Sequence, residues 1–287
     1  LTTYDFSKLQ DAAWVKVLSQ LHAFVGKENL YGSQVLVVTP WAAFIVAMIL
    51  TAVVACLIGY PALRLKGHYL AMATLGFGLI VHKMVLGSNI TGTTDGITGV
   101  PEWNLFAGLT VTGKSALRIE NYYISVGLVL VLLILLSNML DSRVGRALRA
   151  IHDRETAANA IGINTARYKL KTFVLSAVLA AIAGVFFTHF NGGIGPSEAS
   201  ALKSVRYVAL AAAGGMANLW GVSLISMLIN FLSLRDWFGS YDNAVFGALL
   251  IIIMSIAPEG PLKPIGMWIR RGFARIVARP EVQHETP

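Results

Sequence analysis

The chain has 287 residues, of which 55% are hydrophobic and only 13% are charged. A soluble domain carries about 25% charged residues, so this composition excludes an ordinary soluble protein. Several apolar runs approach the ~20 residues that an α-helix needs to cross the hydrocarbon core of a bilayer, and they lack the short alternating pattern of a transmembrane barrel. The sequence therefore predicts an all-α fold, a polytopic transmembrane helical bundle.

The net charge of +8 is better explained by basic loops on one side of a membrane than by a nucleic-acid partner. Cys56 is the single cysteine, which excludes an internal disulfide, and its apolar surroundings predict a buried, inert thiol. Without a cysteine cluster, neither a metal site nor a cofactor is expected.

Three regions follow from the order of the apolar runs. Residues 1–34 are mixed in composition and predict an external segment with a short amphipathic helix (Phe6 to Leu21) and a turn at Asn29–Ser33. Residues 35–258 form the transmembrane domain, and residues 259–287 form a basic tail. The predicted spans are Val35–Tyr60, His68–Leu86, Tyr122–Met139, Thr172–Phe190, Val205–Trp220, Val222–Leu234 and Ala244–Ala257.

Lys and Arg residues set the orientation of these spans. They concentrate in Arg64–Lys66, in the block between Asp141 and Lys171, and in the C-terminal tail, so all three are expected in the cytoplasm. The segments Gly87–Asn121, Asn191–Lys203 and Arg235–Asn243 then face outside. Because Val35 also starts outside and the chain begins at Leu1 rather than Met, a further helix upstream is expected.

The block Ser142–Lys171 is basic and polar between two apolar spans. At helical spacing, Val144, Leu148 and Ile151 fall on one side and arginines surround the others, which predicts a short helix at the membrane surface. Two other stretches contain glycines inside apolar runs: Gly76 and Gly78, which follow Thr74 before this block, and Gly214 and Gly215 after it. Glycines there permit either close helix packing, which is the favoured interpretation, or broken helices.

The central block carries Thr156-Ala157-Ala158, three further residues and Gly162. Together with PALRLKGHYLAMATLGFG, TGTTDGITGVP, GGMANLWG and PEGPLKPIG, it resembles the branched-chain amino acid ABC importer permeases of the LivM type, from about Tyr60 to Gly266. In that family the block offers a coupling helix to an ATPase subunit. The resemblance implies this role for Arg146, Arg149, Glu155, Thr156, Ala157, Ala158 and Gly162, although Arg146 and Arg149 suit lipid phosphates equally well.

The same resemblance implies a translocation path along Thr74, Gly76, Gly78, Gly214 and Gly215. It also implies docking of a binding protein at Thr94, Asp95 and Thr98, where plain turn chemistry is the favoured alternative. The implied partners are a second, LivH-like permease, two ATP-binding subunits, a periplasmic or lipid-anchored substrate-binding protein and membrane lipids, in the bacterial inner membrane. The chain has no P-loop, so it is expected to be a non-catalytic transport subunit.

Other functions remain open at this point. A urea or short-amide importer of the same family differs only in cargo. An ion-coupled amino acid carrier would need a buried acidic residue in mid-span, which the sequence does not offer; its ionisable residues in the spans, His82, Lys83 and His189, are explained by snorkelling to the interface. A membrane scaffold is the most distant alternative.

Overall fold

The computed structural model describes residues 3, 24–28, 34–65, 68–105, 108–215 and 218–234, and near the C-terminus residues 244, 245, 247, 248, 251 and 255. The chain divides into two compact units, Leu1–Ala201 and Leu202–Pro287. The expected amphipathic helix, the Asn29–Ser33 turn, the bulk of the last span and the basic tail lie outside the described residues. The described part is dominated by helices, which confirms the all-α class.

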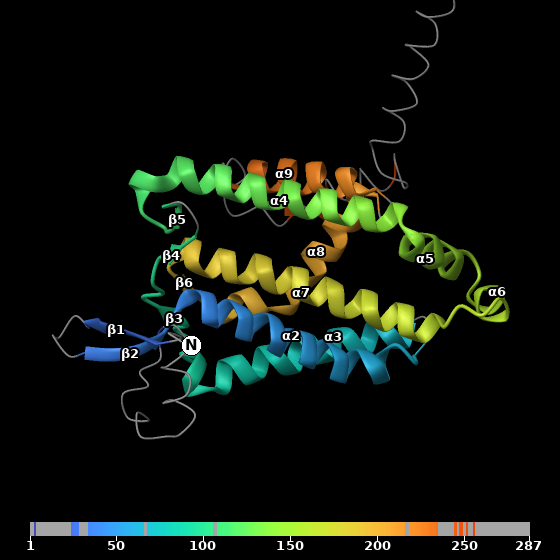
Figure 1. Cartoon of the computed structure of the whole chain (residues 1–287), viewed down its shortest axis with the longest axis horizontal. Coiled ribbons are helices and arrows are strands. Elements are labelled where there is room, and N and C mark those ends of the chain that lie inside the picture. The colour runs from blue at the N-terminus through green and yellow to red at the C-terminus, as the bar shows by residue number, and fades with distance from the viewer. Residues whose placement is uncertain are drawn as a thin grey trace, which may run out of the picture. The chain divides into compact units, whose positions relative to one another are not determined.

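Unit one contains six α-helices in its described part (Figure 1). Four helical segments of this unit are long and apolar enough to cross a membrane. At a rise of about 1.5 Å per residue, even the shortest of these four segments comes close to the ~30 Å thickness of the hydrocarbon core. The six helices of this unit are α2 (Pro40–Ala62), α3 (His68–Gly87), α4 (Arg118–Asp141), α5 (Arg143–Asp153), α6 (Glu155–Ala160) and α7 (Thr165–Asn191).

The first span begins later than the expected Val35. Residues Gln34–Val38 form strand β2, which pairs antiparallel with β1 (Phe24–Glu28). Thr39 is extended, with φ −61° and ψ 144°, and Pro40 opens α2. Proline disfavours the helical conformation in the residue before it and suits the first helical position, which explains why the helix begins there.

Helices α2 and α7 run antiparallel and pack side by side (Figure 1). A Cβ atom on Gly59 of α2 would lie 2.8 Å from Cδ1 of Phe173 on α7, so glycine allows this close approach. The buried residues of α2 are Ala55, Gly59 and Ala62, all small. Cys56 is exposed on α2, so the prediction of a buried thiol is wrong; the packed stripe is too narrow to include it.

Short strands and 3₁₀ turns form the segment between α3 and α4. They are η2 (Asn89–Thr91), β3 (Ile97–Thr98), β4 (Trp103–Asn104), β5 (Thr110–Val111) and η3 (Ser115–Leu117). β4 pairs with β5, and β3 pairs with β6 (Gly193–Ile194), which follows α7 and is itself followed by η4 (Pro196–Ala199). This segment is therefore fastened to the end of α7.

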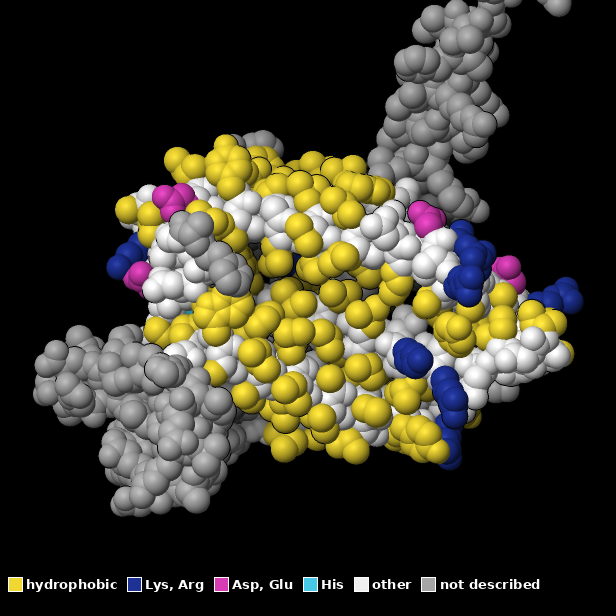
Figure 2. All heavy atoms as spheres, viewed as in Figure 1, with side chains coloured by type: hydrophobic (Ala, Val, Ile, Leu, Met, Phe, Trp, Pro, Cys, Tyr) yellow, Lys and Arg dark blue, Asp and Glu magenta, His cyan; other side chains and the backbone are white. Residues whose placement is uncertain are grey.

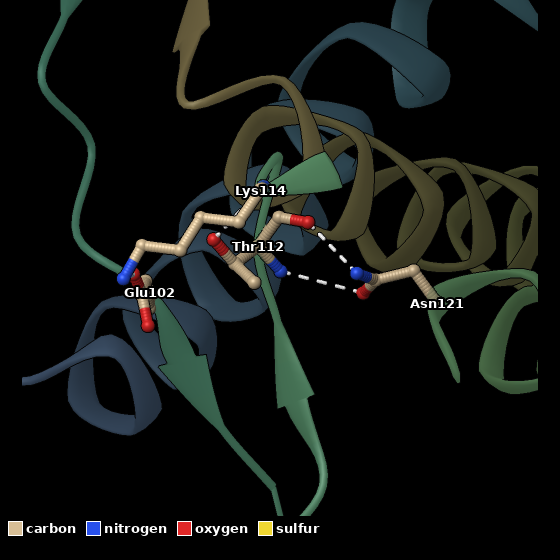
Figure 3. A network of polar contacts seen from close by, with 4 residues as sticks. All are labelled: Glu102, Thr112, Lys114 and Asn121. Atoms are coloured by element: carbon tan, nitrogen blue, oxygen red, sulfur yellow. Dashed lines mark hydrogen bonds and ion pairs between the residues drawn. The ribbon is translucent and has the colours of Figure 1, made fainter. Parts of the chain in front are cut away.

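A buried amide fixes the start of α4 (Figure 3). Asn121 is 0% exposed. Its Oδ1 accepts from the backbone N–H of Thr112 at 3.3 Å, and its Nδ2 donates to the carbonyls of Thr112 at 2.8 Å and Leu117 at 2.9 Å. Beside it, Lys114 and Glu102 form an exposed ion pair at 2.6 Å. The amide satisfies backbone groups that the short strand β5 leaves unpaired.

Unit two is described as two helices, α8 (Ala201–Gly214) and α9 (Leu219–Leu234). The sequence predicts the boundary between two spans near Trp220, whereas α8 ends at Gly214 and α9 begins at Leu219. Both helices are shorter than the ~20 residues that a full crossing requires.

Candidate coupling and translocation sites

The corner between α4 and α5 is tightly closed. Ser142 caps α5, its Oγ accepting from the N–H of Val144 at 3.2 Å. A Cβ atom on Gly145 would lie 1.9 Å from the carbonyl oxygen of Leu140, so only glycine fits there. The last carbonyls of a helix lack intrahelical partners, and two arginines of α5 supply them here. Arg149 donates to Leu140 O at 2.9 Å and Arg146 to Asp141 O at 3.3 Å.

Helix α6 ends in a Schellman motif. Gly162 has φ +87°, its N–H donates to Asn159 O at 3.0 Å, and the N–H of Ile163 donates to Ala158 O at 3.0 Å. These are the two hydrogen bonds that define the motif, and the left-handed residue between them favours glycine. The expectation that Gly162 ends a helix in such a conformation agrees with this geometry.

The residues around α6 divide into a buried set and an exposed set. Ala158 is 2% exposed and packs inside the loop, so it offers no side chain to a partner. Thr156, Ala157 and Gly162 are exposed, and Ile161 is 74% exposed at the tip. We call these four exposed residues the α6 tip.

Helix α6 is also tied to α7. Glu155 forms an ion pair with Lys169 at 2.6 Å, between the first residue of α6 and the second turn of α7. Asn164 caps α7, its Oδ1 accepting from the N–H of Arg167 at 3.1 Å. Helix α6 is therefore linked to α7 by this ion pair, and α5 is linked to the end of α4 by the two arginines.

The surface of unit one separates apolar and basic side chains. In Figure 2 hydrophobic side chains cover the middle of the long helices, and Lys and Arg gather around α5 at one end. Among the described residues, no group of three His, Cys, Asp or Glu is placed to hold a metal ion.

Thr74, Gly76 and Gly78 lie on α3, which continues unbroken from His68 to Gly87. Nothing lies within 4 Å of a Cβ atom built on either glycine. Thr74 directs its Oγ1 to the carbonyls of Leu70 at 3.1 Å and Ala71 at 3.0 Å. Helix α3 is therefore not broken at Gly76 and Gly78, and it does not pack closely there against another described segment. The two glycines lie on an open surface of α3.

Gly214 and Gly215 lie where α8 ends. Gly215 has φ +88°, and a Cβ atom on Gly214 would lie 2.3 Å from Cα of Val222 on α9. Away from this turn, Arg206 of α8 donates to Ser233 Oγ of α9 at 3.2 Å. The chain thus turns back on itself, and α8 with α9 forms an antiparallel hairpin, as expected for a broken or re-entrant element.

Thr94 and Asp95, in the segment between α3 and α4, are exposed, and Thr94 Oγ1 lies 3.4 Å from Asp95 Oδ1. Thr98 belongs to β3 and pairs with Gly193. Three predicted docking residues therefore share one loop.

His189 differs from the expectation of snorkelling. It is 4% exposed, its Nδ1 lies 2.8 Å from the carbonyl oxygen of Pro101, and its ring lies 5.4 Å from that of Trp103. A carbonyl can only accept, so Nδ1–H donates. His189 is thus a structural link between α7 and the segment between α3 and α4.

Sequence reasoning missed several residues at these sites. Arg206 was not counted among the ionisable residues of the spans, although it lies three residues after Lys203 on α8. Trp103 carried no local signal, because its partners Trp41 and His189 are distant in the sequence. Asn121 was also missed, although its partners lie only four and nine residues away. The exposure of Ile161 could have been suspected from its place directly before Gly162.

These features define a class of protein: a multi-pass membrane protein with a rigid, basic surface loop and a short helical hairpin. A profile of the family described as branched-chain amino acid transport system permease component matches residues 13–254. The chain belongs to this family.

Curated relatives agree with this assignment. The LivM permease of the high-affinity branched-chain amino acid system of Escherichia coli is 31% identical over 82% of this chain and 60% of its own length. The LivH permease of the same organism is 31% identical over 61% of this chain and 59% of its own length. The ribose import permease RbsC of Haemophilus influenzae is 30% identical over 41% of this chain and 39% of its own length. The chain spans about three fifths of the LivM and LivH relatives. No solved structure matches.

Proposed function

We propose that the chain is a transmembrane subunit of an ATP-driven importer that carries branched-chain or related hydrophobic amino acids across the bacterial inner membrane. The family assignment supports the class of cargo. The α6 tip is the observation that carries the coupling mechanism, because an exposed apolar residue on a rigid basic loop favours a protein partner.

In this mechanism the α6 tip docks on an ATP-binding subunit. Closure of two such subunits moves the tip, and the capped corner and the Glu155–Lys169 pair pass the movement to α4 and α7. The long helices then alternate between outward and inward access. The path is proposed to run along Thr74, Gly76, Gly78, Gly214 and Gly215.

The remaining partners follow from the same proposal. A second, LivH-like permease completes the pore, since the chain resembles both LivM and LivH. A periplasmic or lipid-anchored binding protein delivers cargo to the external loop at Thr94, Asp95 and Thr98. The loop Asp141–Lys171 and the C-terminal tail face the cytoplasm, in keeping with the basic side chains around α5 (Figure 2).

The test uses the complete importer in proteoliposomes with loaded binding protein. Ile161→Asp introduces a charge at the docking surface, and we expect leucine uptake and substrate-stimulated ATP hydrolysis to fall about tenfold or more. Ile119→Asp is the matched control, because Ile119 is 73% exposed at the other end of α4. Ala158→Asp is a poor probe of docking, since the buried side chain would disrupt the loop itself.

Two results would count against the proposal. Normal coupling in Ile161→Asp would remove the α6 tip from the ATPase interface. Leucine uptake that continues without nucleotide would replace the ATP-driven mechanism with an ion-coupled one. Uptake of urea in place of leucine would change only the cargo.

A further inference from the structure

One side of α2 is exposed along most of the helix and leads to a cation just past its end. Its residues follow one another at spacings of four, four, three and four, which places them on one helix face. This face is turned away from Gly59, the residue of α2 that meets Phe173 of α7. We call it the α2 outer face, and it consists of Ile49, Val53, Leu57, Tyr60 and Arg64.

The order of side chains along the α2 outer face matches the layers of a bilayer. Leu57 is 70% exposed and lies within the apolar helix that is long enough to cross a membrane. Tyr60 follows it and is 59% exposed, and tyrosine is enriched where the hydrocarbon core meets the headgroups. Arg64 comes last, at the level where a headgroup would lie. The face therefore passes from hydrocarbon to headgroup chemistry within about two helical turns.

Arg64 has a defined position over Tyr60. The N–H of Leu63 donates to Gly59 O at 2.9 Å and that of Arg64 to Pro61 O at 3.2 Å, so the turn continues the helical course of α2. Arg64 thus lies four residues after Tyr60 on the same side. Its guanidinium donates to Tyr60 Oη, and its Cζ lies 4.4 Å from the centroid of the ring. These two contacts orient an exposed guanidinium.

No carboxylate neutralises this guanidinium among the described residues. The sequence from Pro40 to Thr94 contains neither Asp nor Glu. The ion pairs of the described residues involve other cations. The guanidinium carries five N–H donors in a planar fork, which matches two oxygens of a phosphate. Contact with Tyr60 leaves donors of Arg64 available for such a ligand.

Helix α7 adds positive charge at the same end of α2. Because the two helices are antiparallel and Gly59 faces Leu170, Lys171 lies near the level of Gly59, and Arg167 lies one turn further, near that of Arg64. Both cations are exposed. Figure 2 shows Lys and Arg side chains at this end of the apolar surface of unit one. The local field therefore attracts anions.

We propose that the α2 outer face binds an anionic phospholipid. Its phosphate pairs with the guanidinium of Arg64 beside the hydroxyl of Tyr60, and an acyl chain lies along Leu57, Val53 and Ile49. Charge complementarity selects an anionic headgroup, because a zwitterionic one brings an ammonium toward the cations. This binding requires neither ATP nor cargo, so it does not rest on the proposed function.

The experiment titrates the purified full-length protein, with its associated subunits in detergent, with phosphatidylglycerol. Native mass spectrometry counts the bound lipid. We expect Arg64→Gln to raise the Kd about tenfold or more, because it removes a charge-assisted, bidentate contact. Tyr60→Phe keeps the ring under the guanidinium but removes the hydroxyl, and it should raise the Kd about threefold.

Arg167→Gln is the matched control, because Arg167 is an exposed cation near the same level with no described aromatic partner. Diffuse attraction to one surface cation accounts for about a fivefold change at most. A change for Arg167→Gln as large as that for Arg64→Gln overturns the proposal, since diffuse charge would then explain the binding.

Phosphatidylcholine with the same acyl chains tests the choice of headgroup. Its affinity should change less than about twofold in Arg64→Gln, and an equal weakening for both lipids overturns the selection of an anionic headgroup. If Arg64→Gln cannot be purified, Tyr60→Phe decides. Weaker binding of phosphatidylglycerol alone supports the proposal, and unchanged binding overturns it.

A second permease is the other occupant that an exposed apolar face could take. Photoreactive benzoylphenylalanine in place of Leu57 distinguishes the two in membranes that contain the complete protein. We expect crosslinks to phospholipid. Crosslinks mainly to another protein chain overturn the proposal and assign the α2 outer face to a subunit interface.

Discussion

Asn121 shows how one buried side chain can replace a missing strand partner. Its amide pairs with both backbone groups of Thr112 (Figure 3). It also donates to the carbonyl of Leu117. Backbone polar groups that are buried without partners cost about 1–3 kcal/mol each, so the amide is worth more than its own hydrogen bonds suggest. Its removal would release the segment between α3 and α4 from the start of α4.

Asn121→Ala should therefore destabilise the protein by about 2 kcal/mol or more, because it leaves backbone groups of Thr112 and Leu117 without their side-chain partner. Thermal unfolding in detergent, followed by fluorescence, measures the effect. Asn138→Ala, at an exposed position of the same helix, is the control and should unfold like the native chain. Equal midpoints for the two variants would show that the amide adds no stability.

Gly162 allows a second prediction at this scale. Its φ of +87° is strained for any residue with a Cβ, but nothing lies within 4 Å of the position. Gly162→Ala should therefore cost about 1–2 kcal/mol through backbone strain alone, and Gly162→Asn should cost less, since Asn tolerates this conformation better. Comparing loss of coupled ATP hydrolysis on warming would rank the variants; an Ala variant as robust as the native chain would contradict the strain argument.

The residue scale also shows what sequence can predict. The left-handed conformation at Gly162 follows from a local rule and was predicted. The bonds of Arg146 and Arg149 to the end of α4 were not, because charge and spacing alone do not say which carbonyls an arginine reaches. The burial of His189 depends on Pro101 and Trp103, which are far away in the sequence.

At the scale of elements, the corner between α4 and α5 joins a long apolar helix to the basic loop that carries the α6 tip. Gly145 permits contact with Leu140, and the arginines supply partners for the last carbonyls. The corner is therefore a closely packed joint rather than a flexible linker. In the proposed mechanism, the stiffness of this corner determines how fully movement of α6 reaches α4.

Gly145→Ala should disrupt the corner between α4 and α5, because the added methyl group would lie 1.9 Å from the carbonyl oxygen of Leu140, which cannot move without bending α4. We expect a destabilisation of about 1–3 kcal/mol and a loss of substrate-stimulated ATP hydrolysis. Gly127→Ala, within α4 at a position with nothing within 4 Å, is the control. If both variants couple normally, the corner does not transmit force.

Most elements were predictable because their apolar runs are long and continuous. The spans on α2, α3, α4 and α7 were all found, with shifts of their ends. The strand at Gln34–Val38 was missed, because its apolar run continues into α2 and only Pro40 marks the boundary. The hairpin was foreseen as an alternative, since its glycines were recognised, but its contacts depend on tertiary structure.

At the scale of the whole molecule, orientation in the membrane is the property that the proposed mechanism requires. The external loop at Thr94 and the α6 tip must lie on opposite sides. Both positions are exposed in unit one. The single cysteine makes the arrangement accessible to labelling.

In a Cys56→Ala background, Thr94→Cys should react with a membrane-impermeant maleimide added to intact cells, whereas Ala157→Cys should react only after the membrane is opened. The basic residues around Ala157 and the positive-inside rule give this direction. Cys56→Ala should itself be nearly neutral, because the side chain is exposed on α2. Labelling of Ala157→Cys in intact cells would reverse the topology and rule out a cytoplasmic coupling loop.

The short arms of the α8–α9 hairpin have a consequence for how the protein is made. Each arm is shorter than a full span, and α8 begins with two cations, so neither arm should partition into the bilayer by itself as it leaves the ribosome. The long helices, which are long and apolar enough to span by themselves, should insert first. Biogenesis would then have a late step, in which α8 and α9 enter the membrane as a folded pair rather than as nascent helices.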